Sequence, residues 1–196
     1  MSNPLASRQF LFLPALMVSL AVCLWATVGY ATETSSGAPQ SDVERDALFA
    51  ALKAAPDATE AKRIENQIWE SWIAAAPTDD VRSKVEKAMQ RRSVYDFQGA
   101  KDILDEVVVE APDYSEGWNQ RAFVSFLQGN YEDSLADIEK ALELEPRHFG
   151  ALSGQAMIFM TMGRMQLGQK ALREAVKIHP YLKERGLLVE EKGQDL

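Results

Sequence analysis

The side chains that could carry out chemistry are few. The chain has one cysteine, Cys23, and two histidines, His148 and His179. A structural zinc site normally needs four cysteine or histidine ligands, and an intramolecular disulfide needs two cysteines, so the chain supplies too few residues for either. The histidines occupy similar places in two successive turns between predicted helices, where capping a helix or facing solvent is the expected role. We therefore predict no metal and no cofactor.

The acidic residues are numerous, but their spacing matches no catalytic pattern. Glu143 and Glu145 lie near a predicted helix end and are interpreted as solvated charges. Ser115 and Glu116 are interpreted as residues that start a helix. The sequence contains no glycine-rich phosphate loop, no Gly-x-Ser-x-Gly motif and no His-Glu-x-x-His motif. These observations predict that the protein is not an enzyme.

The composition indicates an acidic globular protein. Of 196 residues, 46% are hydrophobic, and 21 Lys and Arg against 29 Asp and Glu give a formal net charge of −8. Proteins that bind nucleic acid usually carry a basic domain or a basic stripe. The charge balance therefore predicts that the partner is not a nucleic acid.

The N-terminal 31 residues predict export. Residues 10–30 contain no Asp, Glu, Lys or Arg, and Gly29-Tyr30-Ala31 fits the small-x-small pattern at which signal peptidases cut. We interpret residues 1–31 as a signal peptide, which predicts that the chain is periplasmic or otherwise exported.

Two alternatives to cleavage stay open. The apolar run is long enough to cross a hydrocarbon layer of ~30 Å, so an uncleaved anchor in the cytoplasmic membrane, with the rest of the chain facing the periplasm, is the first alternative. Lipid attachment at Cys23 is the second, although Val22 rather than a small residue precedes that cysteine. Residues 32–40, rich in Ser, Thr, Gly and Pro, predict a flexible linker in either case.

A period of 34 residues organises most of the remaining chain. Pro112, Pro146 and Pro180 stand 34 residues apart. The same step connects positions that keep their size or apolar character: Ala88, Ala122 and Ala156; Leu104, Ile138 and Leu172; Phe97, Tyr131 and Met165. A period of this length predicts a stacked array of identical supersecondary units. Within each unit, apolar residues recur at helical spacing on both sides of a turn, so each unit is predicted to be a pair of helices.

This pattern resembles the tetratricopeptide repeat, or TPR. The middle unit carries the residues typical of that repeat: Trp118, Ala122, Gly129, Tyr131, Ala141 and Pro146. The resemblance implies an all-α fold, an α-solenoid of antiparallel helix hairpins wound into a right-handed superhelix, with repeats at residues 81–112, 115–146 and 149–180. The chain is also similar to small secreted proteobacterial TPR proteins of unassigned role.

The flanks are predicted to cap the array. Residues 41–77 read as an amphipathic helical hairpin, which is either an N-terminal cap or a degenerate repeat. Residues 181–192 are expected to form a short closing helix, within a C-terminal segment of residues 181–196.

The resemblance also implies a concave groove lined by the first helix of each repeat. The groove residues that follow from it are Met89, Arg92, Asn119, Phe123, Phe126, Leu127, Met157 and Met160. Exposed apolar surface of this kind usually marks a binding site, and methionine adapts to irregular partners. We therefore expect weak or transient binding of a protein segment there. The alternative is that a flanking helix fills the same stripe as core.

A second surface is basic. Arg82, Lys84, Lys87 and Arg91 lie on the first helix of the first repeat and would suit an acidic segment or lipid head groups. The alternative is a solvated face balanced by neighbouring acids.

Together these features predict a non-enzymatic interaction module of the cell envelope, whose contact with a membrane is limited to an uncleaved N-terminal segment. The alternative function is a structural element that assembles into homo-oligomers, in which Trp69, Trp72 or the closing helix would be buried between copies.

Overall fold

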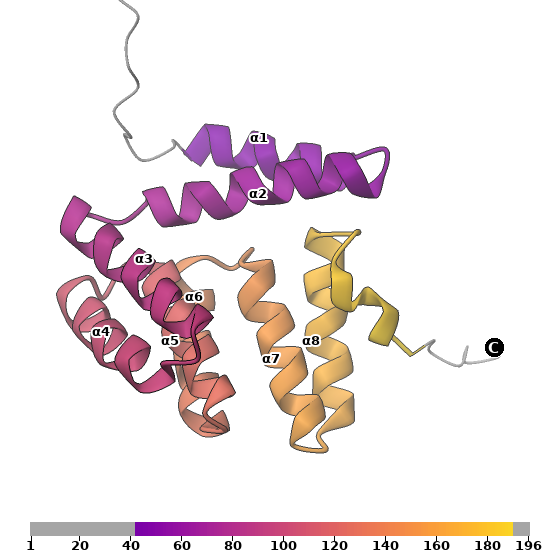
Figure 1. The fold of residues 1–196 in the computed structure, drawn as a ribbon. Coiled ribbons are helices and arrows are strands. Elements are labelled where there is room, and N and C mark those ends of the chain that lie inside the picture. The colour runs from indigo at the N-terminus through magenta and orange to yellow at the C-terminus, as the bar shows by residue number, and fades with distance from the viewer. Residues whose placement is uncertain (1–41, 190–196) are drawn as a thin grey trace, which may run out of the picture. The chain divides into compact units, whose positions relative to one another are not determined.

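The computed structural model describes residues 42–189, which form an array of helix hairpins (Figure 1). Their helices are α1 (Asp42–Lys53), α2 (Ala58–Ala74), α3 (Asp79–Ser93), α4 (Phe97–Glu110), α5 (Ser115–Leu127), α6 (Tyr131–Leu144), α7 (Phe149–Thr161), α8 (Met165–Ile178) and the 3-10 helix η1 (Lys183–Leu187). The predicted signal peptide and linker, residues 1–31 and 32–40, lie outside the described residues, as do residues 190–196. None of the helices in residues 42–189 has the length and hydropathy needed to cross a membrane.

The hairpins pack in chain order. Helix α3 pairs with α4, α5 with α6 and α7 with α8, while α4 contacts α5 and α6 contacts α7. Small residues at the 34-residue step, such as Ala88, Ala122 and Ala156, are almost completely buried and let paired helices approach closely. This arrangement confirms the predicted all-α solenoid of the TPR type.

The turn between the two helices of each repeat requires a residue with left-handed backbone conformation at the equivalent position. Gly129 has φ 81° and Gly163 has φ 74°, and the residue 34 positions before Gly129 is Tyr95, with φ 64°. Glycine adopts this region without steric cost, whereas a side chain with a Cβ does not. The first repeat therefore holds a strained residue where the other two have glycine.

We expect Tyr95→Gly to raise the free energy of unfolding by about 0.5–1 kcal/mol, because relief of the left-handed strain exceeds the extra entropy that glycine has in the unfolded chain. Tyr95→Ala is the control, since it also removes the exposed ring but keeps the strain. Urea titrations followed by circular dichroism measure both. Equal stabilities of the two variants would contradict the strain argument.

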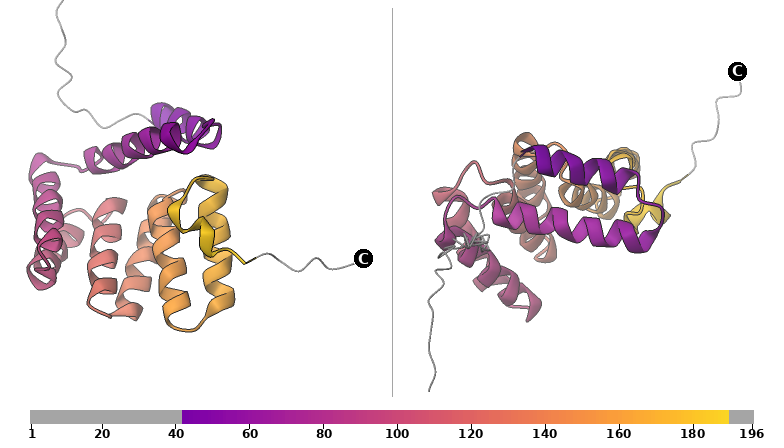
Figure 2. Two further views of the ribbon diagram at one scale, coloured as in Figure 1. Left: turned by 45° about the vertical axis from the view of Figure 1, so that its right-hand side comes forward. Right: turned by 90° about the horizontal axis from the view of Figure 1, so that it is seen from above.

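The N-terminal hairpin lies across the ends of the other helices. Helix α2 contacts α3 and α5, and α1 contacts α8, so the hairpin extends from the first repeat to the last (Figure 1 and the view from above in Figure 2). One core cluster joins these distant parts of the chain, with members Phe49, Leu52, Ile68, Trp72, Phe149 and Leu172.

Polar contacts also hold the hairpin. Arg147, in the turn before α7, forms an ion pair of 2.6 Å with Asp46 and lies 4.3 Å from the ring centroid of Phe49. The Tyr181 hydroxyl donates to the carbonyl of Ala55 at 3.2 Å. The hairpin is therefore part of the folded array.

The C-terminal end differs from the helix expected over residues 181–192. Within residues 181–189, the part of this segment that the structure describes, the only helix is the 3-10 segment η1, and Leu188 and Val189 follow it as a short strap. The side-chain amide of Gln169 fixes this strap by donating to the carbonyl of Leu187 and accepting from the amide of Val189, both at 2.8 Å. The side-chain amide of Gln169 therefore pairs with backbone of the segment in which a closing helix was expected.

Candidate functional site

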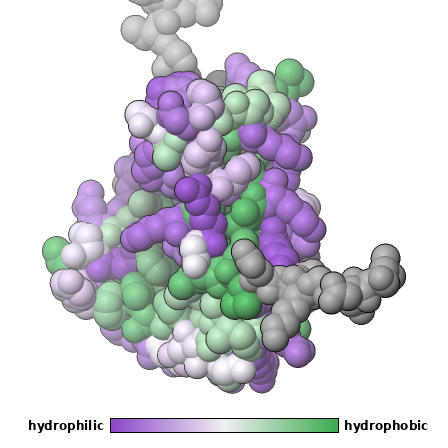
Figure 3. All heavy atoms as spheres, turned by 90° about the vertical axis from the view of Figure 1, so that its right-hand side faces the viewer, coloured by the Kyte–Doolittle hydropathy of each residue, from purple (hydrophilic) through white to green (hydrophobic). Residues whose placement is uncertain are grey.

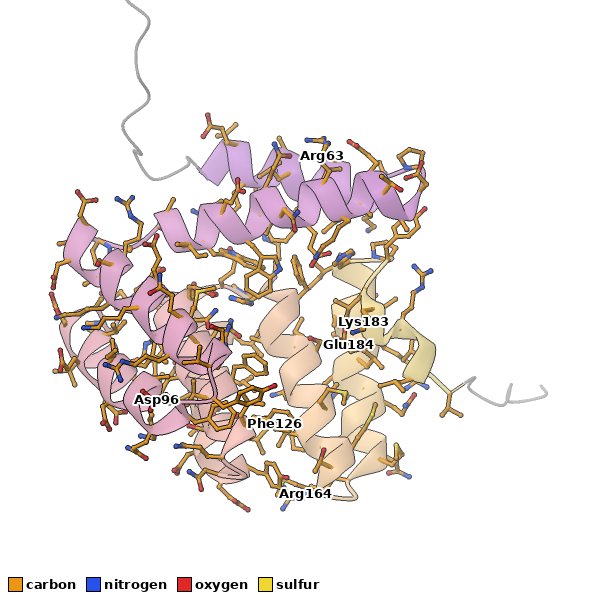
Figure 4. The ribbon with its side chains drawn as sticks, viewed as in Figure 1. Arg63, Asp96, Phe126, Arg164, Lys183 and Glu184 are labelled. Carbon is orange, nitrogen blue, oxygen red and sulfur yellow. The ribbon has the colours of Figure 1, made fainter. Side chains whose placement is uncertain are left out.

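A groove of about 370 Å³ lies on the inner face of the array. Its walls come from the C-terminal end of α3, from α5 and α6, and from α7, with single side chains contributed by α2 and η1. Phe123 is 45% exposed there although it is a large apolar side chain, and Phe126 lies between α5 and α7 (Figure 4). Only Trp69 of α2 reaches the lining, so the N-terminal hairpin covers an edge of the groove and leaves its apolar part open.

The structure brings together six of the eight predicted groove residues: Met89, Arg92, Asn119, Phe123, Phe126 and Met157. Leu127 does not line the groove, although it is 39% exposed. Met160 packs against the core instead, where the missing Cβ of Gly168 makes room for its Cγ atom. The difference arises because Met160 faces α8, the second helix of its own repeat.

Beneath the groove lies a buried carboxylate, Glu116, which the sequence suggested only as a residue that starts a helix. Glu116 is completely buried, and its Oε2 atom accepts hydrogen bonds from His148 Nε2 at 2.9 Å and from Asn119 Nδ2 at 3.1 Å. The Nδ1 atom of His148 accepts from the amide of Ala151 at 3.2 Å, which places the ring proton on Nε2. His148 thus caps α7, as expected, and also joins two repeats.

The same network positions Arg92. Its guanidinium donates to the side-chain oxygen of Gln120, whose amide nitrogen donates to Glu116. The Arg92 guanidinium carbon also lies 4.6 Å from the ring centroid of Phe123. Burial lowers the pKa of Arg92, and the negative charge of Glu116 opposes that shift. Arg92 is therefore held in the groove wall by Gln120, and the negative charge of Glu116 partly offsets its positive charge.

No local signal in the sequence distinguishes Glu116 from the acids that begin other helices. It stands in the first turn of α5, where an acid is also favoured by the helix dipole. The available signal was its place in the repeat, because the resemblance to the tetratricopeptide repeat also implies that position 116 faces the groove. Only the approach of His148, 32 residues later in the chain, makes it a buried partner.

A second cavity of about 390 Å³ adjoins the groove. It lies between one face of α2, the start of α7 and residues 179–184. The two cavities share Trp69, Gly150, Ser153 and Glu184 in their linings. They therefore form one continuous surface along α7, apolar towards α5 and more polar towards α2.

His179 and Glu65 are in contact in the lining of the second cavity. His179 Nε2 and Glu65 Oε2 are 3.3 Å apart. Burial lowers the pKa of His179, although Glu65 opposes the shift. Burial alone would raise the pKa of Glu65, but hydrogen bonds from Lys62 and His179 outweigh it and leave that pKa below its usual value. His179 is the C-cap residue of α8, where its backbone amide donates to the carbonyl of Ala175, so the expected capping role is confirmed; the alternative surface role is wrong, because the residue is almost fully buried.

The predicted basic surface of α3 is largely paired. Arg82 forms an ion pair of 2.7 Å with Asp79, Lys84 reaches Glu110 at 2.6 Å, and Arg91 pairs with Asp96. Lys87 forms no ion pair with another residue in the range 42–189. The positive charge that α3 offers a partner is therefore smaller than its sequence suggests.

Within residues 42–189, no group of three or more His, Cys, Asp or Glu side chains is placed to hold a metal ion.

Comparisons with known proteins agree with the repeat pattern. A family model of the tetratricopeptide repeat matches residues 115–148. A TPR repeat-containing protein of Rhizobium etli is 40% identical over 137 residues, covering 69% of this chain and 66% of the relative. A tetratricopeptide repeat protein 36 homologue of Nematostella vectensis is 35% identical over 81 residues, covering 40% of this chain and 44% of the relative.

Among solved structures, two crystal structures of MamA are similar to this chain. One has a TM-score of 0.49 at 15% identity and covers 70% of this chain and 87% of its own. The other has a TM-score of 0.48 at 15% identity and covers 76% of this chain and 87% of its own.

Proposed function

Since the chain is a tetratricopeptide repeat protein, we propose that it is a non-enzymatic interaction module that binds a segment of a partner protein in its inner groove. Repeat arrays of this kind use their concave surfaces for binding. The observation that carries the proposal is the open apolar lining around Phe123, which a monomeric protein would otherwise bury.

The size of the groove limits the affinity. Burying the exposed parts of Phe123 and two or three neighbouring apolar side chains contributes about 3–6 kcal/mol. Association itself costs at least ~4 kcal/mol in lost translational and rotational freedom. Binding through this groove alone is therefore weak or transient, and tighter binding requires polar contacts in addition.

The proposed location is outside the cytoplasmic membrane. The support is the uncharged run of residues 10–30 and the cleavage pattern that ends at Ala31. The mass of the chain recovered from cells distinguishes a cleaved signal peptide from an uncleaved membrane anchor. A chain that begins at Thr32 supports cleavage, and a chain that retains residues 1–31 in the membrane fraction supports the anchor.

Phe123→Glu is expected to abolish capture of the partner in crosslinking pull-downs from envelope extracts, because it places a charge on the apolar floor of the groove. Leu127→Glu is the matched control, since Leu127 lies on the same helix with similar exposure but outside the groove lining. Circular dichroism checks that both variants remain helical. Equal capture by Phe123→Glu and Leu127→Glu would contradict binding in this groove.

Homo-oligomeric assembly remains the alternative function, supported by a different surface. Of the two tryptophans that an oligomer was expected to bury, Trp72 is buried inside the chain and Trp69 is partly buried against the same core. Apolar side chains are nevertheless exposed at the C-terminal end of the array, at Met165, Leu167, Leu187 and Val189, and Figure 3 shows apolar surface in the lower part of that end. Sedimentation of the purified chain decides between the two, because a monomer at micromolar concentration contradicts assembly.

A further inference from the structure

We infer that the partner segment is basic as well as apolar: a lysine or arginine of the segment pairs with Glu184 beside Trp69, while its apolar side chains occupy the groove between α5 and α7. The inference rests on the proposed function and specifies the partner of the same site.

Glu184 is the acidic group that both cavities share. It projects from η1 and lines the groove as well as the cavity beside α2 (Figure 4). The residue is partly buried, yet its carboxylate has no hydrogen bond or ion pair with any residue in the described range. A carboxylate that lines a groove and is not paired within the described range can pair with a cation of a ligand, so this position favours a positively charged ligand group.

The cations near Glu184 have other partners or face outward. Lys62 forms an ion pair of 2.9 Å with Glu65. Arg185 donates to the carbonyl of Pro180 at 3.1 Å and lies 5.3 Å from the ring centroid of Tyr181. Lys183 is exposed and lines only the cavity beside α2. Within the shared lining, Glu184 therefore keeps its charge available.

Trp69 supplies the second element of a site for a cation. Its ring is held edge-on against Trp72 and Phe149, with centroid distances of 5.0 and 5.6 Å. It lies directly over Gly150, where an added Cβ would come within 2.5 Å of its Cη2 atom. Trp69 and Glu184 line the same two cavities, and an aromatic ring and a carboxylate in one lining favour lysine and arginine side chains through cation–π attraction combined with charge pairing.

The other charges of the site agree with a basic partner. Arg92, at the opposite end of the groove, already bonds Gln120 and is opposed by the buried Glu116. Three of the four predicted basic residues of α3 are paired with acids, which leaves little to attract an acidic segment. The whole chain has a formal net charge of −8, so long-range attraction also favours a basic partner.

A random library of 12-residue peptides tests the inference. The purified full-length chain is used for selection, and the enriched peptides are then measured one at a time by fluorescence anisotropy. We expect the enriched peptides to combine apolar residues with lysine or arginine. Glu184→Gln should weaken their binding about tenfold, whereas Glu139→Gln, an exposed acid of α6 outside both cavities, should leave it unchanged.

A double-mutant cycle identifies the pair. Replacing the basic residue of a selected peptide by alanine should cost about tenfold with the unchanged chain and nothing with Glu184→Gln. Peptides that depend on Phe123 but bind Glu184→Gln as tightly as the unchanged chain would overturn the inference and leave the proposed function standing. If Phe123→Glu weakens none of the selected peptides, both the inference and groove binding are overturned.

Discussion

Trp72→Ala is expected to lower the free energy of unfolding by about 3–5 kcal/mol, the range for removing a large buried aromatic side chain. Trp72 is 1% exposed and stacks on His148 with the ring centroids 3.9 Å apart. It also contacts Phe149 and Phe49, at centroid distances of 5.0 and 6.1 Å. One side chain of α2 thus connects the N-terminal hairpin with the start of the third repeat. Guanidinium titrations followed by circular dichroism measure the loss.

Substitutions at two glycines of α7 test whether the N-terminal hairpin packs against that helix. Gly150→Ala should also destabilise, by about 1–3 kcal/mol, because the added Cβ meets the ring of Trp69. The nearest neighbour of a Cβ at Gly154 is Ile138 Cδ1 at 3.6 Å, an ordinary contact. Gly154→Ala should therefore stabilise the helix by up to about 1 kcal/mol. If Trp72→Ala cost less than 1 kcal/mol and both glycine variants behaved alike, the hairpin would not be docked on α7.

Glu116→Leu is the second substitution with a large expected effect, a loss of about 3–5 kcal/mol in the free energy of unfolding. It removes the acceptor for His148 and Asn119 and leaves their donors buried without partners. It also removes the negative charge that opposes Arg92. Thermal and guanidinium unfolding of the purified variant measure the loss.

Glu116→Gln is the control for that substitution. The amide keeps the size of the side chain and one oxygen acceptor, so its loss should be smaller, about 1–2 kcal/mol. A leucine variant as stable as the glutamine variant would show that the network beneath the groove contributes little to stability.

Most residues of the groove could be predicted because they occupy equivalent positions in successive 34-residue repeats. The 34-residue step places equivalent positions of successive first helices on one inner face, and this brought Met89, Phe123 and Met157 together. The prediction for Met160 was wrong because adjoining sides of α7 face the groove and α8, and Met160 lies on the side that packs against Gly168 of α8. Periodicity assigns a residue to a helix more reliably than to one of two adjoining faces of that helix.

The partners of the charged side chains could not be predicted from the period in the same way. Lys84 reaches Glu110, 26 residues later in the chain, and His179 reaches Glu65, 114 residues earlier. Whether a charged side chain is solvated, paired or buried depends on which distant helix lies beside it. The sequence therefore suggested a basic surface that the structure largely neutralises, and it did not show that Glu116 is buried and paired with His148.

The sequence by itself determined the repeat, its helix pairs and the inner face, because these follow from local helical periodicity and from small residues at fixed steps. Only the tertiary structure decided where the N-terminal hairpin lies. Its apolar stripe, with Ile68 and Trp72, would suit either a degenerate repeat or a cap. The position of the hairpin depends on shape, since Gly150 leaves room for Trp69, and on the pairing of His179 with Glu65 of α2, 114 residues earlier in the chain.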